Sequence, residues 1–391
     1  MSVHLLIDLG FIIVFAAAQY AVTVFLLRRI DRNLIGAPRP LAKAGLILFD
    51  VLLAVSYPAF SGDLAAFFGL PIHPAQVLGF AAFSYLLLTT GCVLVRLGML
   101  CFRKRSRTPI DYHRRRLLTA AGNAVIAAPF IVYGYAALIE RKRFRVREVD
   151  ITLPNLPADL AGLRLLHLSD IHLGAFLSPG ELALVIEIAN TLRAHLAIIT
   201  GDLISWRGDP LEPCICGISR LRVDAGIFAC MGNHERYAGV EQEAQTIAAR
   251  QGIRFLRGES TQLRFGASTL NIAGVDYEPI SHRPRYLRNA EQLVVPHAAN
   301  ILLSHNPDVF PVAARQGYDL TLAGHTHGGQ VNIELLNRSI NPAAFITPFV
   351  YGLYRSDHKA AYVTSGIGTV GIPARLGMPP EISLLKLDRS R

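Results

Sequence analysis

Residues 163–172 read Leu-Arg-Leu-Leu-His-Leu-Ser-Asp-Ile-His, an apolar run that leads directly into Asp170 and His172. A short apolar run bounded by turn residues predicts a buried strand. Taken alone, an Asp-x-His fragment is more often a turn or a cap than a functional site. This stretch is informative because the same arrangement recurs along residues 149–391.

Four more apolar runs end in polar residues, at residues 196–200, 227–231, 301–303 and 318–323. The residues that follow these runs are Gly201-Asp202, Gly232-Asn233-His234-Glu235, Ser304-His305-Asn306 and Gly324-His325-Thr326-His327. Buried parallel strands read as apolar runs, and the loops beyond their carboxyl ends form the binding crevice of an open α/β sheet. We therefore expect the polar side chains to meet at one edge of an α/β domain, with helices over residues 179–195 and 240–251.

The series resembles the full signature of the calcineurin-like metallophosphoesterases over nearly all of residues 160–390. The resemblance implies a four-layer β-sandwich flanked by helices. The sequence Gly-His-Thr-His-Gly-Gly-Gln at residues 324–330 and Pro-Pro-Glu-Ile at residues 379–382 are similar to the membrane-associated branch of that family. This branch includes bacterial phosphodiesterases and enzymes similar to UDP-2,3-diacylglucosamine pyrophosphatase.

The resemblance also implies two divalent metal ions and their ligands. One ion would be held by Asp170, His172, Asp202 and His327. The other would be held by Asp202, Asn233, His305 and His325, so that Asp202 bridges the two. Imidazole, carboxylate and amide ligands suit Mn²⁺, Fe or Zn²⁺, and the residue types do not choose among them.

A dinuclear centre of this kind predicts hydrolysis of a phosphodiester or a phosphoanhydride. A hydroxide that bridges the two ions would attack phosphorus in line. We expect His234 to protonate the leaving oxygen, because it adjoins Asn233 but is not itself a predicted ligand. The alternative for His234 is a structural histidine. Arg236, Tyr237, His282 and Arg283 are possible substrate contacts that nothing in one sequence singles out.

The N-terminal part of the chain is much more apolar than the rest. Four apolar stretches, at residues 5–27, 41–60, 74–101 and 117–138, each approach the roughly 20 residues that a helix needs to cross a bilayer. We therefore predict a transmembrane domain over residues 1–140, an all-α bundle of four transmembrane helices. The calcineurin-like domain would then occupy residues 141–391.

The basic charge is confined to the same part of the chain. Residues 1–150 hold 18 Lys and Arg against 8 Asp and Glu, whereas residues 151–391 hold 21 of each, so the formal charge of +10 does not lie on the α/β half. This distribution argues against a nucleic-acid partner. The positive-inside rule predicts that the catalytic domain lies on the extracytoplasmic face of a membrane. Together with the resemblance to a membrane-associated bacterial branch, this leads us to expect an integral protein of a bacterial inner membrane. Arg114-Arg115-Arg116 before an apolar run is either a twin-arginine export signal or a set of cytoplasmic anchoring charges.

Two alternatives stay open. The chain could be a transporter or sensor with a non-catalytic phosphoesterase-like domain, and a cytoplasmic catalytic domain would favour UDP-2,3-diacylglucosamine as the substrate. The apolar residues 340–354 either contact a lipid-linked substrate and the membrane surface or pack in the core. The three cysteines Cys214, Cys216 and Cys230 form no recognisable metal site.

Overall fold

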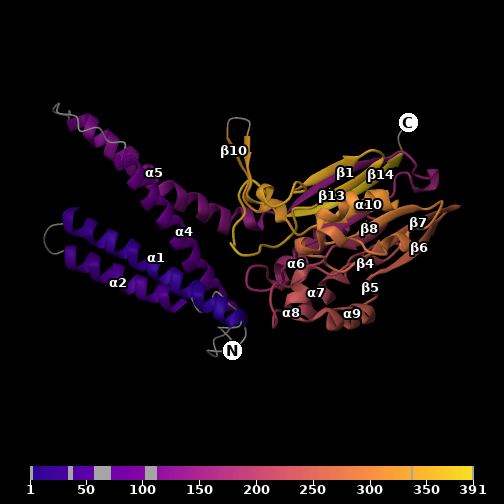
Figure 1. Cartoon of the computed structure of the whole chain (residues 1–391), viewed down its shortest axis with the longest axis horizontal. Coiled ribbons are helices and arrows are strands. Elements are labelled where there is room, and N and C mark those ends of the chain that lie inside the picture. The colour runs from indigo at the N-terminus through magenta and orange to yellow at the C-terminus, as the bar shows by residue number, and fades with distance from the viewer. Residues whose placement is uncertain (1–2, 34–37, 57–71, 102–111, 336–337, 390–391) are drawn as a thin grey trace. The chain divides into compact units, whose positions relative to one another are not determined.

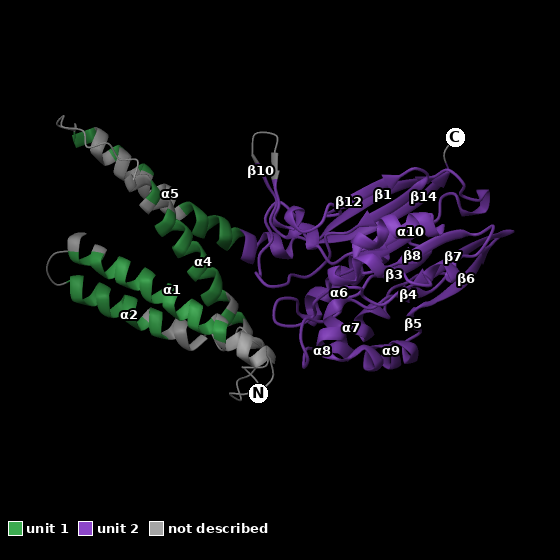
Figure 2. Ribbon diagram, in the orientation of Figure 1, with its two compact units in different colours: residues 1–135 green, residues 136–391 purple. Residues whose placement is uncertain are grey.

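The computed structural model describes residues 3–33, 38–56, 72–101, 112–335 and 338–389. The chain divides into two compact units, residues 1–135 and residues 136–391 (Figures 1 and 2). Each unit has its own secondary-structure class, the first helical and the second α/β.

The first unit consists of long helices. Their bounds are α1 Val3–Asn33, α2 Pro38–Ser56, α4 Ile72–Cys101 and α5 Tyr112–Leu138. Buried Ala82 and Leu86 of α4 pack against Ile12, Phe15 and Ala18 of α1. A polar contact joins α1 to α2, because Thr23 Oγ1 donates a hydrogen bond of 2.5 Å to Asp50 and Gln19 contacts the same carboxylate.

The predicted bundle of four transmembrane helices is wrong. Among the described residues, none of the helices combines the length and the apolar composition that crossing a membrane requires. In α2 the physical reason is visible, because Arg39, Lys43 and Asp50 all lie within its 19 residues. Charged positions of this kind lower the mean hydropathy of a helix, so a count of apolar residues along a stretch overpredicts membrane spans.

The second unit contains two six-stranded sheets. The first has the strand order β1-β14-β2-β3-β4-β5, in which β2, β3, β4 and β5 run parallel. Its strands are β1 Arg145–Leu153, β2 Arg164–Leu168, β3 Leu196–Ile199, β4 Ile227–Ala229, β5 Ile253–Phe255 and β14 Glu381–Arg389. Strand β14 pairs with β2 in antiparallel and with β1 in parallel orientation, so the last strand of the chain lies inside the sheet, next to the edge strand β1.

The second sheet has the order β12-β13-β9-β8-β7-β6, with β7, β8, β9 and β13 parallel. Its strands are β6 Glu259–Phe265, β7 Ser268–Gly274, β8 Ala299–Leu303, β9 Leu320–Ala323, β12 Gly352–Ser356 and β13 Lys359–Val363. A separate hairpin joins β10 Ile333–Leu335 to β11 Arg338–Ile340. The helices of the unit are α6 Pro179–Thr191, α7 Leu211–Ile218, α8 Asn233–Ala238, α9 Glu241–Arg250 and α10 Phe310–Gln316.

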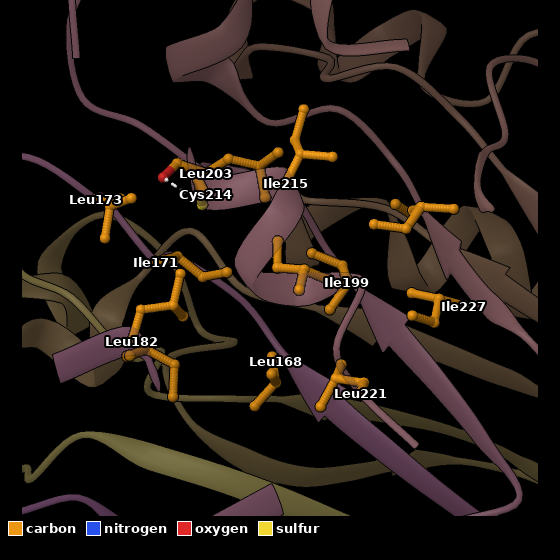
Figure 3. Close-up of a cluster of buried hydrophobic side chains, with 14 of the residues drawn as sticks. Leu168, Ile171, Leu173, Leu182, Ile199, Leu203, Cys214, Ile215, Leu221 and Ile227 are labelled. Carbon is orange, nitrogen blue, oxygen red and sulfur yellow. Dashed lines mark hydrogen bonds between the residues drawn. The ribbon is translucent and has the colours of Figure 1, made fainter. Parts of the chain in front are cut away.

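Alternation along the strands produces the layers. In β3, Leu196 and Ile198 belong to the core between the two sheets, whereas Ala197 and Ile199 belong to the core beneath α6 and α7. Figure 3 shows the latter core, in which Ile199 lies among Leu168, Leu182 and Ile215. A third core packs α10 against the outer face of the second sheet. The result is the expected α/β arrangement of helix, sheet, sheet and helix, with the five predicted strands in place.

Candidate metal centre

Three of the predicted site residues follow neighbouring strands of the first sheet. Asp170 lies two residues beyond β2, Asp202 three residues beyond β3, and Asn233 opens α8 after β4. The loops are bound together at the backbone, since Asp170 N–H donates to Gly201 C=O and His172 N–H donates to Asp202 C=O. Parallel pairing of β2, β3 and β4 therefore delivers these side chains to one edge.

The second sheet delivers the other histidines. His305 lies two residues beyond β8, and His325 and His327 follow β9. His305 Nδ1 donates a 2.6 Å hydrogen bond to Thr200 C=O, which joins the second sheet to the loop after β3 of the first. The carboxyl ends of strands in both sheets thus meet at one place.

A first group of possible ligands consists of four buried side chains. Ligand atoms of Asp170, His172, Asp202 and His327 all lie within 4.8 Å of one another. His172 Nε2 is 3.1 Å from His327 Nε2, and His327 Nε2 is 3.3 Å from Asp170 Oδ1. Ligand atoms that share one cation at about 2.1 Å must be separated by roughly 3.0–3.4 Å, so this spacing fits a metal site.

A second group shares Asp202 with the first. Ligand atoms of Asp202, His305 and His325 again lie within 4.8 Å of one another. His305 Nε2 is 3.1 Å from Asp202 Oδ2 and makes no hydrogen bond, although it is buried. Asn233 Oδ1 is also buried without a hydrogen-bond partner. Buried polar atoms are rarely left unpaired, so Asn233 Oδ1 fits a ligand of a cation, and His305 Nε2 faces the Asp202 carboxylate that would share the same cation.

The charge states of these groups fit metal binding. Burial lowers the pKa of His172 and of His325 to about 3, which keeps both imidazoles neutral and able to offer a lone pair. Burial would also lower the pKa of His305, but the adjacent Asp202 raises it to about 10. In the metal-free protein, protonated His305 therefore stabilises the negative charge of the Asp202 carboxylate. A bound divalent cation would stabilise that charge in its place.

Backbone conformation separates these residues from ordinary loop residues. Five of them have left-handed φ angles, 51° at Asp170, 49° at His172, 55° at Asp202, 72° at His325 and 52° at His327. This region costs non-glycine residues on the order of 1–3 kcal/mol each and persists only where the surroundings enforce it. Such clustering is typical of functional sites.

Close approach explains Gly324 in the same loop. A Cβ at this position would overlap both Ser169 Oγ and the carboxylate of Asp170. His325 N–H also donates to Asp170 Oδ1 and Oδ2, at 3.0 and 3.1 Å. The loop after β9 therefore packs directly on the carboxylate of Asp170 and orients it.

Glu235 ties the loops of the first sheet together. Its fully buried carboxylate accepts hydrogen bonds from the backbone N–H groups of Asp202, Leu203 and Gly232, at 2.9, 2.6 and 2.8 Å. It thereby fixes the turn that presents Asp202 and the start of α8, where Asn233 lies. Glu235 is a positioning residue rather than a ligand.

Arg375 braces the other side of the centre. This fully buried guanidinium donates to the carbonyl groups of Ser365, Gly366 and Gly368, and more weakly to that of His327 at 3.4 Å. The same loop is bonded to the first motif, since Gly368 N–H donates to Asp170 C=O at 2.7 Å. One side chain thus connects the backbones that present two predicted ligands, Asp170 and His327.

His234 lies at the edge of the group. Its Nδ1 donates a hydrogen bond to Ser205 C=O at 2.6 Å, so Nδ1 carries a proton. Nε2 is then the ring nitrogen that could pass a proton to a substrate. The ring stands edge-on to His172, with centroids 4.7 Å apart, and contacts Trp206 and Tyr237. His234 is 8% exposed, which leaves the ring a small path to a substrate.

Three residues that the fold brings to the site were not among the predicted site residues. Tyr277 lies with its ring 5.3 Å from that of His325, Trp206 contacts His234, and Arg375 braces the loops. None of them belongs to a recognisable motif, although Arg375 falls only four residues before the Pro-Pro-Glu-Ile sequence. Of the suggested substrate contacts, Arg236 and His282 line a cavity beside Tyr277, and Arg283 is exposed.

Comparison with known proteins agrees with this geometry. The model of the calcineurin-like phosphoesterase family matches residues 163–329. A metallophosphoesterase of Campylobacter jejuni is 30% identical over 305 residues, which cover 75% of each chain. The chain belongs to the calcineurin-like metallophosphoesterases. This metallophosphoesterase is also 29% identical to a transmembrane protein with a metallophosphoesterase domain from Danio rerio, over 94% of this chain and 86% of the relative.

Family membership confirms the predicted enzyme class. The chain is a metal-dependent phosphoester hydrolase, and its Asp and His cluster is a candidate for the two divalent metals that the family normally uses. The identity of the metals stays open among Mn²⁺, Fe and Zn²⁺. The predicted location in a bacterial inner membrane stays a prediction, as does the side of the membrane on which the catalytic domain lies.

Proposed function

We propose that this metallophosphoesterase hydrolyses a phosphodiester or a phosphoanhydride at a dinuclear metal centre. The predicted ligands are Asp170, His172, Asp202, Asn233, His305, His325 and His327. The observation that carries the proposal is the position of Asp202 in both groups of possible ligands. A carboxylate common to two sites is what a pair of neighbouring cations requires.

When bound, two divalent cations would lower the pKa of water and stabilise charge on the phosphoryl oxygens. The chain's own groups provide the rest. His305 and His172 are oriented through Nδ1 by Thr200 C=O and Ser205 Oγ, which leaves Nε2 directed at the cluster. His234, held through Nδ1 by Ser205 C=O, would deliver a proton from Nε2 to the leaving oxygen.

The proposal is tested on purified protein with bis(p-nitrophenyl) phosphate and added Mn²⁺. We expect hydrolysis, and loss of both activity and bound metal when Asp202 is replaced by Asn. Absence of hydrolysis with Mn²⁺, Fe²⁺ and Zn²⁺ alike would refute it.

His234→Ala tests the acid separately. We expect slower turnover with an unchanged metal content, because His234 is not a proposed ligand. A loss of bound metal in this variant would assign His234 to the metal site instead.

A lipid-linked phosphate ester is the finer substrate class that we propose. Phe345 and Ile346, in the segment predicted to contact lipid or to pack, are 89% and 72% exposed, whereas Phe349 packs between Phe310 and Tyr354. The exposed pair would suit an acyl chain. UDP-2,3-diacylglucosamine is one such compound, and comparison of its hydrolysis with that of UDP-glucose tests whether acyl chains raise kcat/KM.

A further inference from the structure

A row of aromatic side chains borders the candidate metal centre. The ring centroids of Trp206 and Tyr237 lie 6.0 and 5.8 Å from that of His234. Burial raises the pKa of Tyr277, and so does its interaction with Tyr237, which joins the two tyrosines. The ring of Tyr277 in turn lies 5.3 Å from that of His325. The row therefore begins beside the proposed acid and ends beside a proposed metal ligand.

Two rings of this row are open to solvent. Trp206 is 37% exposed and Tyr237 is 66% exposed, whereas His234 between them is 8% exposed. Single exposed aromatic rings are common on protein surfaces and need no functional explanation. Here two of them contact the same histidine, one from the loop after β3 and the other from α8. A leaving group that receives a proton from His234 would therefore lie next to both rings.

The loop that carries Trp206 is held in place by a buried carboxylate. Asp209 accepts hydrogen bonds from the backbone N–H groups of Ser205 and Trp206, both at 2.9 Å, and its own N–H donates to Trp206 C=O at 3.2 Å. Ser205 also orients His172 through its Oγ and His234 through its C=O. The turn that orients these two histidines thus positions the indole ring before a substrate binds.

The side chains of the two segments favour an aromatic ring over an acyl chain or a cation. In the loop after β3 and in α8, all of whose residues the structure describes, the exposed large hydrophobic side chains are Trp206 and Tyr237. Neither segment exposes a large aliphatic side chain for an acyl chain to contact. Arg207 and Arg236 are exposed and adjoin the two rings in the sequence, so their positive charge disfavours a cationic leaving group.

We propose that Trp206 and Tyr237 bind an aromatic ring in the leaving group of the substrate, as in an aryl or a nucleoside phosphoester. This inference rests on the proposed hydrolase function and specifies the group that His234 would protonate. Both residues determine specificity, because they would contact the leaving group and not the reacting phosphorus. Stacking of a base on an aromatic side chain lowers Kd by about 10-fold or more.

The test compares ligands in two pairs on full-length protein loaded with Mn²⁺. Phenylphosphonate and cyclohexylphosphonate, which cannot be hydrolysed to phosphate, differ in the aromaticity of the ring. Adenosine 5′-monophosphate and ribose 5-phosphate differ in the presence of a base. We expect the aromatic member to have a Kd about 10-fold lower in calorimetry, and the pair that shows this preference identifies the leaving group as aryl or nucleoside.

Variants of the two rings assign the preference to them. Trp206→Ala should raise the Kd of the preferred ligand about 10-fold, and Trp206→Phe should retain most of the affinity. Tyr237→Ala should act in the same direction, whereas Tyr112→Ala, which removes a tyrosine of α5 that is 72% exposed, should have no effect. The Kd of methylphosphonate, which has no ring, and the Mn²⁺ content should be unchanged in every variant.

Fluorescence gives a readout that does not depend on turnover. Trp206 is the only tryptophan in the chain, so its emission reports on this site alone. We expect phenylphosphonate or adenosine 5′-monophosphate to quench it in the native protein, and methylphosphonate to leave it unchanged.

The absence of an aromatic preference in both ligand pairs would overturn the inference. A preference that persists undiminished in both Trp206→Ala and Tyr237→Ala would also overturn it. In either case, hydrolysis of bis(p-nitrophenyl) phosphate by the native protein would still uphold the proposed function. Failure of the proposed function itself is distinguishable, because the native protein would then leave bis(p-nitrophenyl) phosphate intact with every metal.

Discussion

Replacement of Arg375 by Met should damage both the stability of the α/β unit and its metal binding. Within 3.2 Å the guanidinium donates to Gly368 C=O at 3.0 Å, Ser365 C=O at 2.8 Å and Gly366 C=O at 3.2 Å. Gly366 C=O keeps Glu381 N–H as a donor at 3.0 Å, but the carbonyl groups of Ser365 and Gly368 lose theirs, and each buried carbonyl left without a donor costs about 1–3 kcal/mol. Removal of a buried cation also relieves its desolvation cost, so we expect a net loss of about 3–5 kcal/mol.

The measurement is thermal unfolding of metal-free protein, together with the number of bound Mn²⁺ ions found by mass spectrometry. For a unit of this size, a loss of that magnitude corresponds to a decrease in Tm of about 6–20 °C. Because Arg375 connects the loops of Asp170 and His327, we expect the ion that these two residues share to be lost first. The variant should therefore retain about one ion where the native protein holds two.

Two further arginine variants serve as controls for the effect of Arg375→Met. Arg355→Met removes a guanidinium that donates to one carbonyl, Thr152 C=O at 2.8 Å, in an exposed position, and should change stability by less than about 0.5 kcal/mol. Arg375→Lys keeps the charge but has fewer donors in a less rigid geometry, and should lie between the native protein and Arg375→Met. If Arg375→Met bound two ions with native affinity, the brace assigned to Arg375 would be incorrect.

Three other perturbations test the site and the core. Burial lowers the pKa of His167 to about 3, so between pH 6.5 and 3 the unfolded chain binds a proton that the folded chain does not, and the free energy of unfolding falls as the pH falls. His167→Gln should therefore reduce that fall by about 1.4 kcal/mol per pH unit, measured by urea denaturation at several pH values. The same dependence of unfolding free energy on pH in the native protein and the variant would contradict this. Gly324→Ala should weaken Mn²⁺ binding about 10- to 100-fold in calorimetry because the new methyl group displaces Asp170. Gly180→Ala should not, because the nearest atom to its new methyl group, Ser178 Oγ, is at an ordinary contact distance of 3.9 Å. Glu235→Gln leaves one acceptor oxygen for three N–H donors and should lower the free energy of unfolding by about 2–4 kcal/mol, measured by urea denaturation. A variant as stable as the native protein would contradict this.

The error in the N-terminal unit and the success in the C-terminal unit have different physical origins. Runs such as residues 163–168 predicted strands correctly because an apolar segment of strand length, followed by turn residues, has few other ways to be buried. Long apolar stretches are less specific, since helices such as α1 and α2 can pack on one another through contacts like that of Thr23 with Asp50. Hydropathy alone did not separate these cases.

The amino-acid sequence specifies which residues follow each strand, and therefore the identity and order of the predicted ligands. That information is local, because a polar residue placed just after a buried strand must emerge at the end of a sheet. The fold alone shows that two sheets bring these ends together, that Arg375, which is distant in the sequence, braces them, and that the ring of Tyr277 lies beside that of His325. These contacts join residues far apart in the chain, and no local pattern encodes a distance between such residues.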